Sequence, residues 1–515
     1  MNETGGKPAT YNESEDTRMI ETVVMSGGAP QSPLMAGFLH ALWTEKKTFL
    51  KFHTSGAGAL MALLFISPKG KDPGEALSSW VEAGVADEIY RTLPQNFKLF
   101  HKPGPFAPIY ARLAERFKVP VGGPETPESH DPIRDFMAEL LVSLRSYSSP
   151  ATSSLRKDPV EQVRDVWMAM WGDGMLARLD PIRRLREKWL TSWLPKDEDR
   201  RLYNDMVDLW FSALTPSTLS SKSLGMAAPL PFLEKLVDFR SLDCRITDLE
   251  KNVEDKRKHA HLCVNAYNMT RDARERPDRR KKRHGAGEQS PAPAQAGAPG
   301  QGAGRLRRKC EHEDDMEKVI EYFVAPSDRL REGHQSDTSP LPDHIVFHAL
   351  DAKGIRAAFS MPFIYPPAQI KDDYYSEGAD HQPINFNRID KVGEFPFALI
   401  DVLAQLEDHL VRRPRDLWDS YVISIMTPVV ALAKAQIEEF KEDNPKCDEC
   451  SDQWTGDMLT AKWNVPPEAQ PFVMDWSYSN LTTLFRVGQE TGRKFVEKYK
   501  NRLYDRTWVD RSGGS

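Results

Sequence analysis

Two strand–turn–helix units follow one another directly near the start of this chain. Residues 19–25 are a short β-branched run that ends in a glycine turn, and from Pro33 the apolar residues take helical spacing. Residues 48–53 are predicted to form a second strand, followed by the turn 54–58 and a continuously apolar helix over 59–66. Two such units in tandem predict a parallel sheet with right-handed crossovers.

The composition predicts a globular protein. The 515 residues are 40% hydrophobic and 28% charged, which suffices for one large domain or several ordinary ones. The net charge of -6 gives no general attraction for polyanions, so no nucleic-acid partner is expected. The longest apolar run, Ala59 to Ile66, is far below the roughly 20 residues that span a bilayer, and the N-terminus lacks the apolar core of a secretory signal. We therefore expect a cytoplasmic protein.

The cysteines indicate a reducing compartment. There are 5 of them, an odd and sparse set, and no disulfide is expected. Cys447 and Cys450 have the spacing of half a zinc knuckle, but a second pair is absent and free loop cysteines are favoured. No acidic loop has calcium-ligand spacing, so neither a metal nor another cofactor is expected.

Changes in composition along the rest of the chain predict its division into segments. The helical stretch 73–240 is rich in Trp and Met, which favours an ordinary core over the alternative of a lipid-facing cap. Basic clusters at 279–283 and 305–309 flank a Gly/Ala/Pro-rich tract that lacks the apolar content to pack. They suit either a solvated insertion or peripheral contact with an anionic membrane. The predicted segments are 1–18, a flexible tail; 19–72, the first half of the core; 73–240, the helical insertion; 241–270, a helical connection; 271–312, a disordered insertion; 313–440, the second half of the core; and 441–515, a helical extension.

Three turns carry the candidate chemistry. The glycine turn at Ser26 aims backbone N–H groups at an anion or a developing oxyanion. Ser55 stands on a sharp strand-to-helix turn between small residues, as a nucleophile requires, and the alternative is a helix N-cap. Glu377 precedes a glycine and suits a general base, although alone it is equally a turn acid. His53, two residues before Ser55, is expected to be packed or hydrogen-bonded, with a direct catalytic role as the alternative.

Together and in this order, these motifs resemble the patatin-like phospholipase family. The resemblance lies in Ser26 to Leu42 (oxyanion turn and first helix), His53 to Leu60 (nucleophile elbow), Arg356 to Pro367 (the segment before the acid) and Glu377 to Ala379 (the acid motif). It implies a three-layer α/β/α fold with a central, mostly parallel sheet and a large helical insertion. It also implies a serine acyl hydrolase that acts on acyl lipids through an acyl-enzyme intermediate.

Carried onto this sequence, the family pattern implies roles for five residues. Ser55 is the expected nucleophile, Glu377 the expected base, and the N–H groups of Gly27, Gly28 and Ala29 the expected oxyanion donors.

The chain departs from the family pattern at several of these positions. His53, Ala57 and Ala29 stand where the family has glycine, and Glu377 stands where it has aspartate. Added side chains crowd a backbone that glycine tolerates better, and one extra methylene displaces a proton acceptor. A second hypothesis is therefore a lipid-binding or regulatory protein that keeps the scaffold without turnover. The head group of the ester and the oligomeric state are left open.

Overall fold

The computed structural model describes the N-terminal strand–turn–helix units and the elements that pack on them. The described residues are 18–28, 31–92, 196–198, 200–202, 205, 233–252, 258–274, 319–327, 346–361, 365, 367–386, 396–404, 410, 413, 417–444, 458–466 and 475–506. Most of the predicted helical insertion 73–240 and of the basic segment 271–312 lies outside these ranges.

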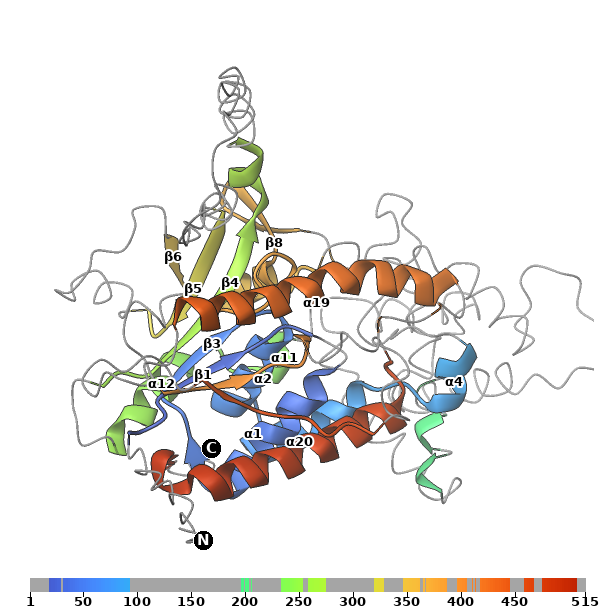
Figure 1. Ribbon diagram of the computed structural model, residues 1–515, viewed down its shortest axis with the longest axis horizontal. Helices are drawn as coiled ribbons and strands as arrows, with labels where there is room; N and C mark the ends of the chain where they lie inside the picture. Colours follow the sequence, from blue (N-terminus) through green and yellow to red (C-terminus); the bar gives the residue numbers. More distant parts are fainter. Residues whose placement is uncertain are drawn as a thin grey trace, which may run out of the picture.

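A nine-stranded sheet forms the centre of the molecule (Figure 1), with strand order β10-β9-β1-β3-β4-β5-β6 and β8 and β7 added beside β4. The strands from β10 to β4 are all parallel, whereas β5 and β8 run antiparallel to β4. The prediction of a mostly parallel sheet is therefore confirmed. The strands are β1 (Thr22–Met25), β3 (Lys51–Thr54), β4 (His261–Asn268), β5 (Ile320–Ala325), β6 (Val346–Ala349), β7 (Ala368–Ile370), β8 (Asp373–Glu377), β9 (Phe397–Ile400) and β10 (Met458–Thr460).

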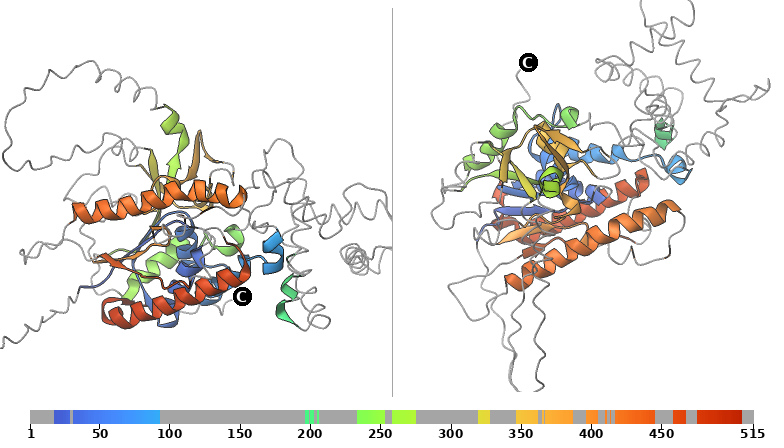
Figure 2. Two further views of the ribbon diagram at one scale, coloured as in Figure 1. Left: turned by 45° about the vertical axis from the view of Figure 1, so that its right-hand side comes forward. Right: turned by 90° about the horizontal axis from the view of Figure 1, so that it is seen from above.

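Helices cover both faces of this sheet. In Figures 1 and 2 the helices α1 and α20 lie on one side of the strands and α19 lies on the other, which gives the three-layer arrangement. The described helices are α1 (Ser32–Thr44), α2 (Ala57–Ile66), α3 (Pro73–Ser78), α4 (Asp87–Thr92), α11 (Leu233–Leu236), α12 (Leu242–Leu249), α16 (Ala352–Ala358), α19 (Leu417–Asp443) and α20 (Tyr478–Tyr499), with short 3₁₀ turns η2 (Ser79–Ala83), η5 (Glu250–Asn252), η6 (Gly378–Asp380) and η9 (Lys500–Arg502). None of the described helices is long and apolar enough to cross a membrane.

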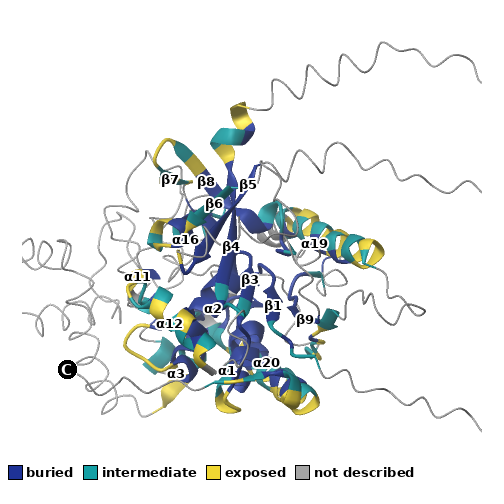
Figure 3. Ribbon diagram, turned by 90° about the vertical axis from the view of Figure 1, so that its left-hand side faces the viewer, coloured by how far each residue is buried: buried dark blue, intermediate teal, exposed yellow. Residues whose placement is uncertain are grey.

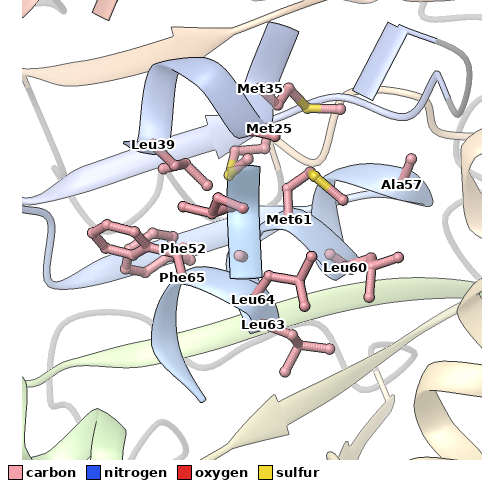
Figure 4. Close-up of a cluster of buried hydrophobic side chains, with 14 of the residues drawn as sticks. Met25, Met35, Leu39, Phe52, Ala57, Leu60, Met61, Leu63, Leu64 and Phe65 are labelled. Carbon is pink, nitrogen blue, oxygen red and sulfur yellow. The ribbon is translucent and has the colours of Figure 1, made fainter. Parts of the chain in front are cut away.

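Alternation along the central strands distributes side chains to the two helical layers. Val23 and Met25 of β1 belong to the large core cluster around α1 and α2, part of which is drawn in Figure 4. Val24, between them, belongs to the cluster that α19 covers through Met426 and Val430. Successive side chains of a strand point to opposite faces, so one short apolar run serves both cores. Figure 3 shows the resulting buried centre of the sheet.

The C-terminal helix α20 packs closely on α1, although the two helices lie near opposite ends of the sequence. A Cβ on Gly37 of α1 would overlap the carbonyl oxygen of Phe485, and one on Gly488 of α20 would overlap that of Leu34. The two backbones therefore approach where neither helix carries a side chain. The predicted C-terminal extension 441–515 thus supplies α20 and β10 to the same layers as the N-terminal units.

Two local predictions differ from the structure. Residues 241–270, expected to be helical, contain α12 but also β4, which lies near the middle of the sheet. Polar residues in buried positions, such as Asn265 and Asn268, hide the strand pattern. The strand predicted at 48–53 begins only at Lys51. Lys47–Thr48 forms a separate strand, β2, antiparallel to β11 (Tyr504–Asp505).

Candidate active site

Ser55 occupies a two-residue turn between a strand and a helix. Strand β3 ends at Thr54 and helix α2 begins at Ala57. Gly56 has a φ of 43°, a left-handed value that glycine adopts with little strain. The N–H of Ser55 donates to the carbonyl of Met25 at 3.1 Å, which ties the turn to the end of β1. The chain thus makes at Ser55 the sharp turn that the sequence predicts there.

Strands β3 and β8 approach each other along the same edge of β4. Strand β3 runs parallel to β4, with Thr54 opposite Val264. Strand β8 runs antiparallel to β4, with its last residue, Glu377, opposite Ala266. Only Asn265 lies between these two positions on β4. The C-terminal ends of β3 and β8 therefore point at each other, and the turns that follow them meet beside Asn265.

Small residues allow the three predicted turns to pack directly. A Cβ on Gly56 would overlap Oε1 of Glu377 and would lie 3.2 Å from the Cβ of Ala379. A Cβ on Gly27 would lie 2.7 Å from that same Ala379 atom. The oxyanion turn, the serine turn and the acid turn consequently meet around Ala379, and the carboxyl group of Glu377 lies against the residue after Ser55.

The Ser55 hydroxyl bonds to the acid turn through a main-chain carbonyl. It donates to the carbonyl oxygen of Gln382 at 3.0 Å, and Nδ2 of Asn265 donates to the same oxygen at 2.8 Å. The Tyr322 hydroxyl donates to the side-chain oxygen of Gln382 at 3.0 Å, which anchors that residue further. Ser55 is fully buried, and among the described residues its hydroxyl bonds to Gln382 and not to Glu377. Because a carbonyl is not a base at neutral pH, this arrangement does not deprotonate the serine.

The predicted oxyanion donors divide into three cases. The N–H of Gly27 donates to the carbonyl of Pro383 at 3.2 Å and is already engaged. Gly28 has a φ of 109°, and its N–H has no acceptor among the described residues. Ala29 lies outside the described residues. The N–H of Gly56, next to Ser55, also has no described acceptor, so Gly28 and Gly56 are the described donors available to an oxyanion.

Burial dominates the electrostatics of the acid turn. Glu377 is only 9% exposed, and its pKa lies well above the usual range because of burial and, secondarily, the charge of Asp380. Burial also raises the pKa of Asp380 to about 6. Tyr365 is buried nearby, and burial together with the Glu377 charge raises the pKa of its hydroxyl. A carboxyl group with a raised pKa is a stronger base than an ordinary surface glutamate once it is ionised.

His53 lies on β3, two residues before Ser55, and its ring contacts another histidine. Its Nε2 is 3.0 Å from Nε2 of His261, the first residue of β4. His53 is 3% exposed, so it is a packed residue in this structure.

Sequence reasoning missed three residues of this site: Asn265, Gln382 and Asp380. Asn265 falls in the strand that the sequence concealed, and only the sheet register places it between the two turns. Gln382 contributes its main-chain carbonyl to the site, and a main-chain contact leaves no pattern of side chains in the sequence. Asp380 carried a readable signal, because it follows the predicted acid by three residues.

No group of three or more His, Cys, Asp or Glu side chains within the described ranges is arranged to hold a metal ion. Cys447 and Cys450 lie outside those ranges.

Comparisons with known proteins add little to this geometry. No family model and no curated protein matches the sequence. Among solved structures, VipD from Legionella pneumophila aligns with 91% of this chain and 67% of its own, at 14% sequence identity and a TM-score of 0.28. A TM-score this low supports neither a shared fold nor a shared function, so the functional proposal rests on the residues of this chain.

Proposed function

We propose that this protein is a serine acyl hydrolase of the patatin-like kind that cleaves carboxylic ester bonds of acyl lipids. The observation that supports the proposal is the convergence of two turns along β4. It brings Ser55, on a strand-to-helix turn, beside the buried carboxyl group of Glu377. A nucleophile and a base on two separate strands need this kind of tertiary convergence.

The reaction assigned to these residues has two halves. The Ser55 side chain first turns from the Gln382 carbonyl toward Glu377, which accepts its proton as Oγ bonds to the acyl carbon. The N–H groups of Gly28 and Gly56 stabilise the oxyanion, and the departing alcohol takes the proton from Glu377. Water then attacks the acyl-serine, and its proton passes through Glu377 back to the Ser55 oxygen as the fatty acid leaves.

The test is hydrolysis of short p-nitrophenyl esters and of a lysophospholipid by the wild type, Ser55→Ala and Glu377→Gln. Ser67→Ala is the matched control, because Ser67 is a second buried serine, at the opposite end of α2, and bonds to Asp238. We expect both site variants to lose activity and the Ser67 variant to keep it. Equal background rates in all four proteins would refute the hydrolase.

One observation favours a second candidate, a lipid-binding protein without turnover. Ser55 is fully buried, and its hydroxyl is held by a carbonyl that Asn265 also holds. A site that persists in this state has no activated nucleophile. This candidate predicts saturable binding of a fluorescent lysophospholipid with no release of fatty acid, and equal affinity in the wild type and Ser55→Ala. Multiple turnover by the wild type would exclude it.

A further inference from the structure

The chain that follows η6 binds two turns of the site through consecutive main-chain carbonyl groups. The carbonyl of Gln382 accepts the hydrogen bond of the Ser55 hydroxyl at 3.0 Å. The carbonyl of the next residue, Pro383, accepts a hydrogen bond from the N–H of Gly27 at 3.2 Å. We call Gln382 and Pro383 the strap. It engages both the predicted nucleophile and one of the predicted oxyanion donors.

An ester substrate needs the same two groups. In acyl transfer the serine oxygen must reach the acyl carbon, and main-chain N–H groups must hold the oxygen of that acyl group. Under the strap, Ser55 is fully buried and Gly27 is buried. The strap and the acyl group of a substrate therefore compete for the same hydrogen-bonding groups.

The side chain of Gln382 fastens the outer end of the strap. Its Oε1 accepts a hydrogen bond from the Tyr322 hydroxyl of β5 at 3.0 Å and a longer one from Nδ2 of Asn265 at 3.3 Å. Gln382 itself is only half-buried, so it lies between Ser55 and the solvent. A few polar contacts thus hold the part of the strap that borders water.

The residues after the strap are held more firmly. Ile384 is fully buried in the core under α19, and its N–H donates to Oε1 of Gln436 on that helix at 3.2 Å. Asn385 is also fully buried, and its Nδ2 donates to the carbonyl of Thr54 at 3.2 Å. Apolar burial fixes this end, so a movement that uncovers Ser55 is confined to the strap.

We propose that the strap is autoinhibitory: Gln382 and Pro383 occupy the ester-binding position of the resting protein, and the side-chain contacts of Gln382 set how often they leave it. The effect on turnover rests on the proposed hydrolase, whereas the cover over Ser55 does not depend on turnover.

Release of the strap prepares the site for the reaction. The Ser55 hydroxyl loses its carbonyl acceptor and can turn toward Glu377. The N–H of Gly27 becomes available beside those of Gly28 and Gly56, which adds a third donor for the oxyanion. A ligand that binds only the released form shifts the population toward it.

The first experiment measures how often position 55 is uncovered, without any turnover. In a Ser55→Cys protein, alkylation of the new thiol by iodoacetamide is followed by peptide mass spectrometry. Cys244, an exposed native cysteine, is the internal reference. We expect the thiol at position 55 to react far more slowly than Cys244. Tyr322→Phe should accelerate its alkylation between about twofold and about tenfold, because one hydrogen bond to the strap is lost, and Gln382→Ala should accelerate it at least as much.

Tyr375→Phe is the matched control. Tyr375 and Tyr322 are both 2% exposed, but the hydroxyl of Tyr375 donates to Glu321 and not to the strap. Equal acceleration by Tyr375→Phe would assign the exposure to general loosening and overturn the proposal. Tyr322→Phe should add little in a Gln382→Ala background, because its hydroxyl acts on the strap through the Gln382 side chain. Undiminished acceleration in that background would also overturn it.

The second experiment links release of the strap to turnover. With Ser55 intact, kcat/KM for a p-nitrophenyl ester should rise in Tyr322→Phe and Gln382→Ala by the factors seen in alkylation. In a protein that hydrolyses the ester, faster alkylation without this rise would overturn autoinhibition.

The two experiments separate the strap from the hydrolase. The expected alkylation pattern with no hydrolysis by any protein would support the cover over position 55 and reject the hydrolase. Hydrolysis by the wild type, together with a thiol at position 55 that reacts as fast as Cys244, would reject the strap and keep the hydrolase.

Discussion

Replacing Gly56 with alanine tests the convergence of the two turns directly. The substitution meets two separate costs. An alanine at a φ of 43° costs about 1–2 kcal/mol of backbone strain. Its Cβ would also overlap the Glu377 carboxyl group, and overpacking of this kind costs about 1–3 kcal/mol more. We therefore expect a loss of roughly 2–5 kcal/mol in the free energy of unfolding.

The chain supplies a matched control for the backbone strain alone. Gly70 also has a positive φ, 70°, but a Cβ there would have nothing within 4 Å. Urea unfolding of Gly70→Ala should show only the loss of about 1–2 kcal/mol that the left-handed backbone costs. The difference between the two variants contains the crowding against Glu377 and any extra strain of the Gly56 backbone, whose ψ is −124°. Ester hydrolysis should separate them further, because displacement of the base by about 1 Å reduces the rate about a hundredfold.

A third variant decides where the crowding arises. In a Glu377→Ala background the new methyl group at residue 56 meets only the Cβ of Ala379, at 3.2 Å, so the cost of Gly56→Ala should fall toward that of Gly70→Ala. If Gly56→Ala is no more destabilising than Gly70→Ala, or if its cost is unchanged without the Glu377 side chain, the placement of the carboxyl group against the serine turn is wrong.

Three further expectations concern stability. Gly488→Ala should cost about 1–3 kcal/mol and lower Tm, because its Cβ would overlap the Leu34 carbonyl between α20 and α1; an unchanged Tm would contradict the close packing. Tyr375→Phe should cost about 1.5–3 kcal/mol in urea unfolding, because it removes a 2.7 Å hydrogen bond to the buried Glu321 carboxylate. Although burial opposes its ionisation, hydrogen bonds from His348, Tyr375 and a neighbouring asparagine lower the pKa of Glu321. Its contribution is therefore present above the unfolded pKa near about 4.3 and is lost as pH falls through the folded pKa, so the stability difference between wild type and Glu321→Gln should shrink in acid; a pH-independent difference would exclude this linkage.

The local sequence pattern was sufficient to predict an element where neighbouring residues alone determine its structure. The runs that became β1 and α2 are short and apolar, the run that became α1 has helical spacing, and the glycine beside Ser55 marks the turn. Strand β4 was not predicted, because Asn265 and Asn268 are polar yet buried, and the prediction of strands relied on apolar residues. The site was incomplete for the same reason, since Asn265 belongs to that strand.

The sequence by itself determined the two tandem strand–turn–helix units, and therefore a parallel sheet, because periodicity and turn residues act over a few neighbouring positions. It also singled out Ser55 and Glu377. Only the tertiary structure decided that the turns after the strands of these two residues meet, since that depends on the register of β3 and β8 against β4. The same register decided that the serine hydroxyl bonds to the Gln382 carbonyl. Residues more than 300 positions apart in the chain share no local signal, and only the hydrogen-bonded alignment of strands brings them together.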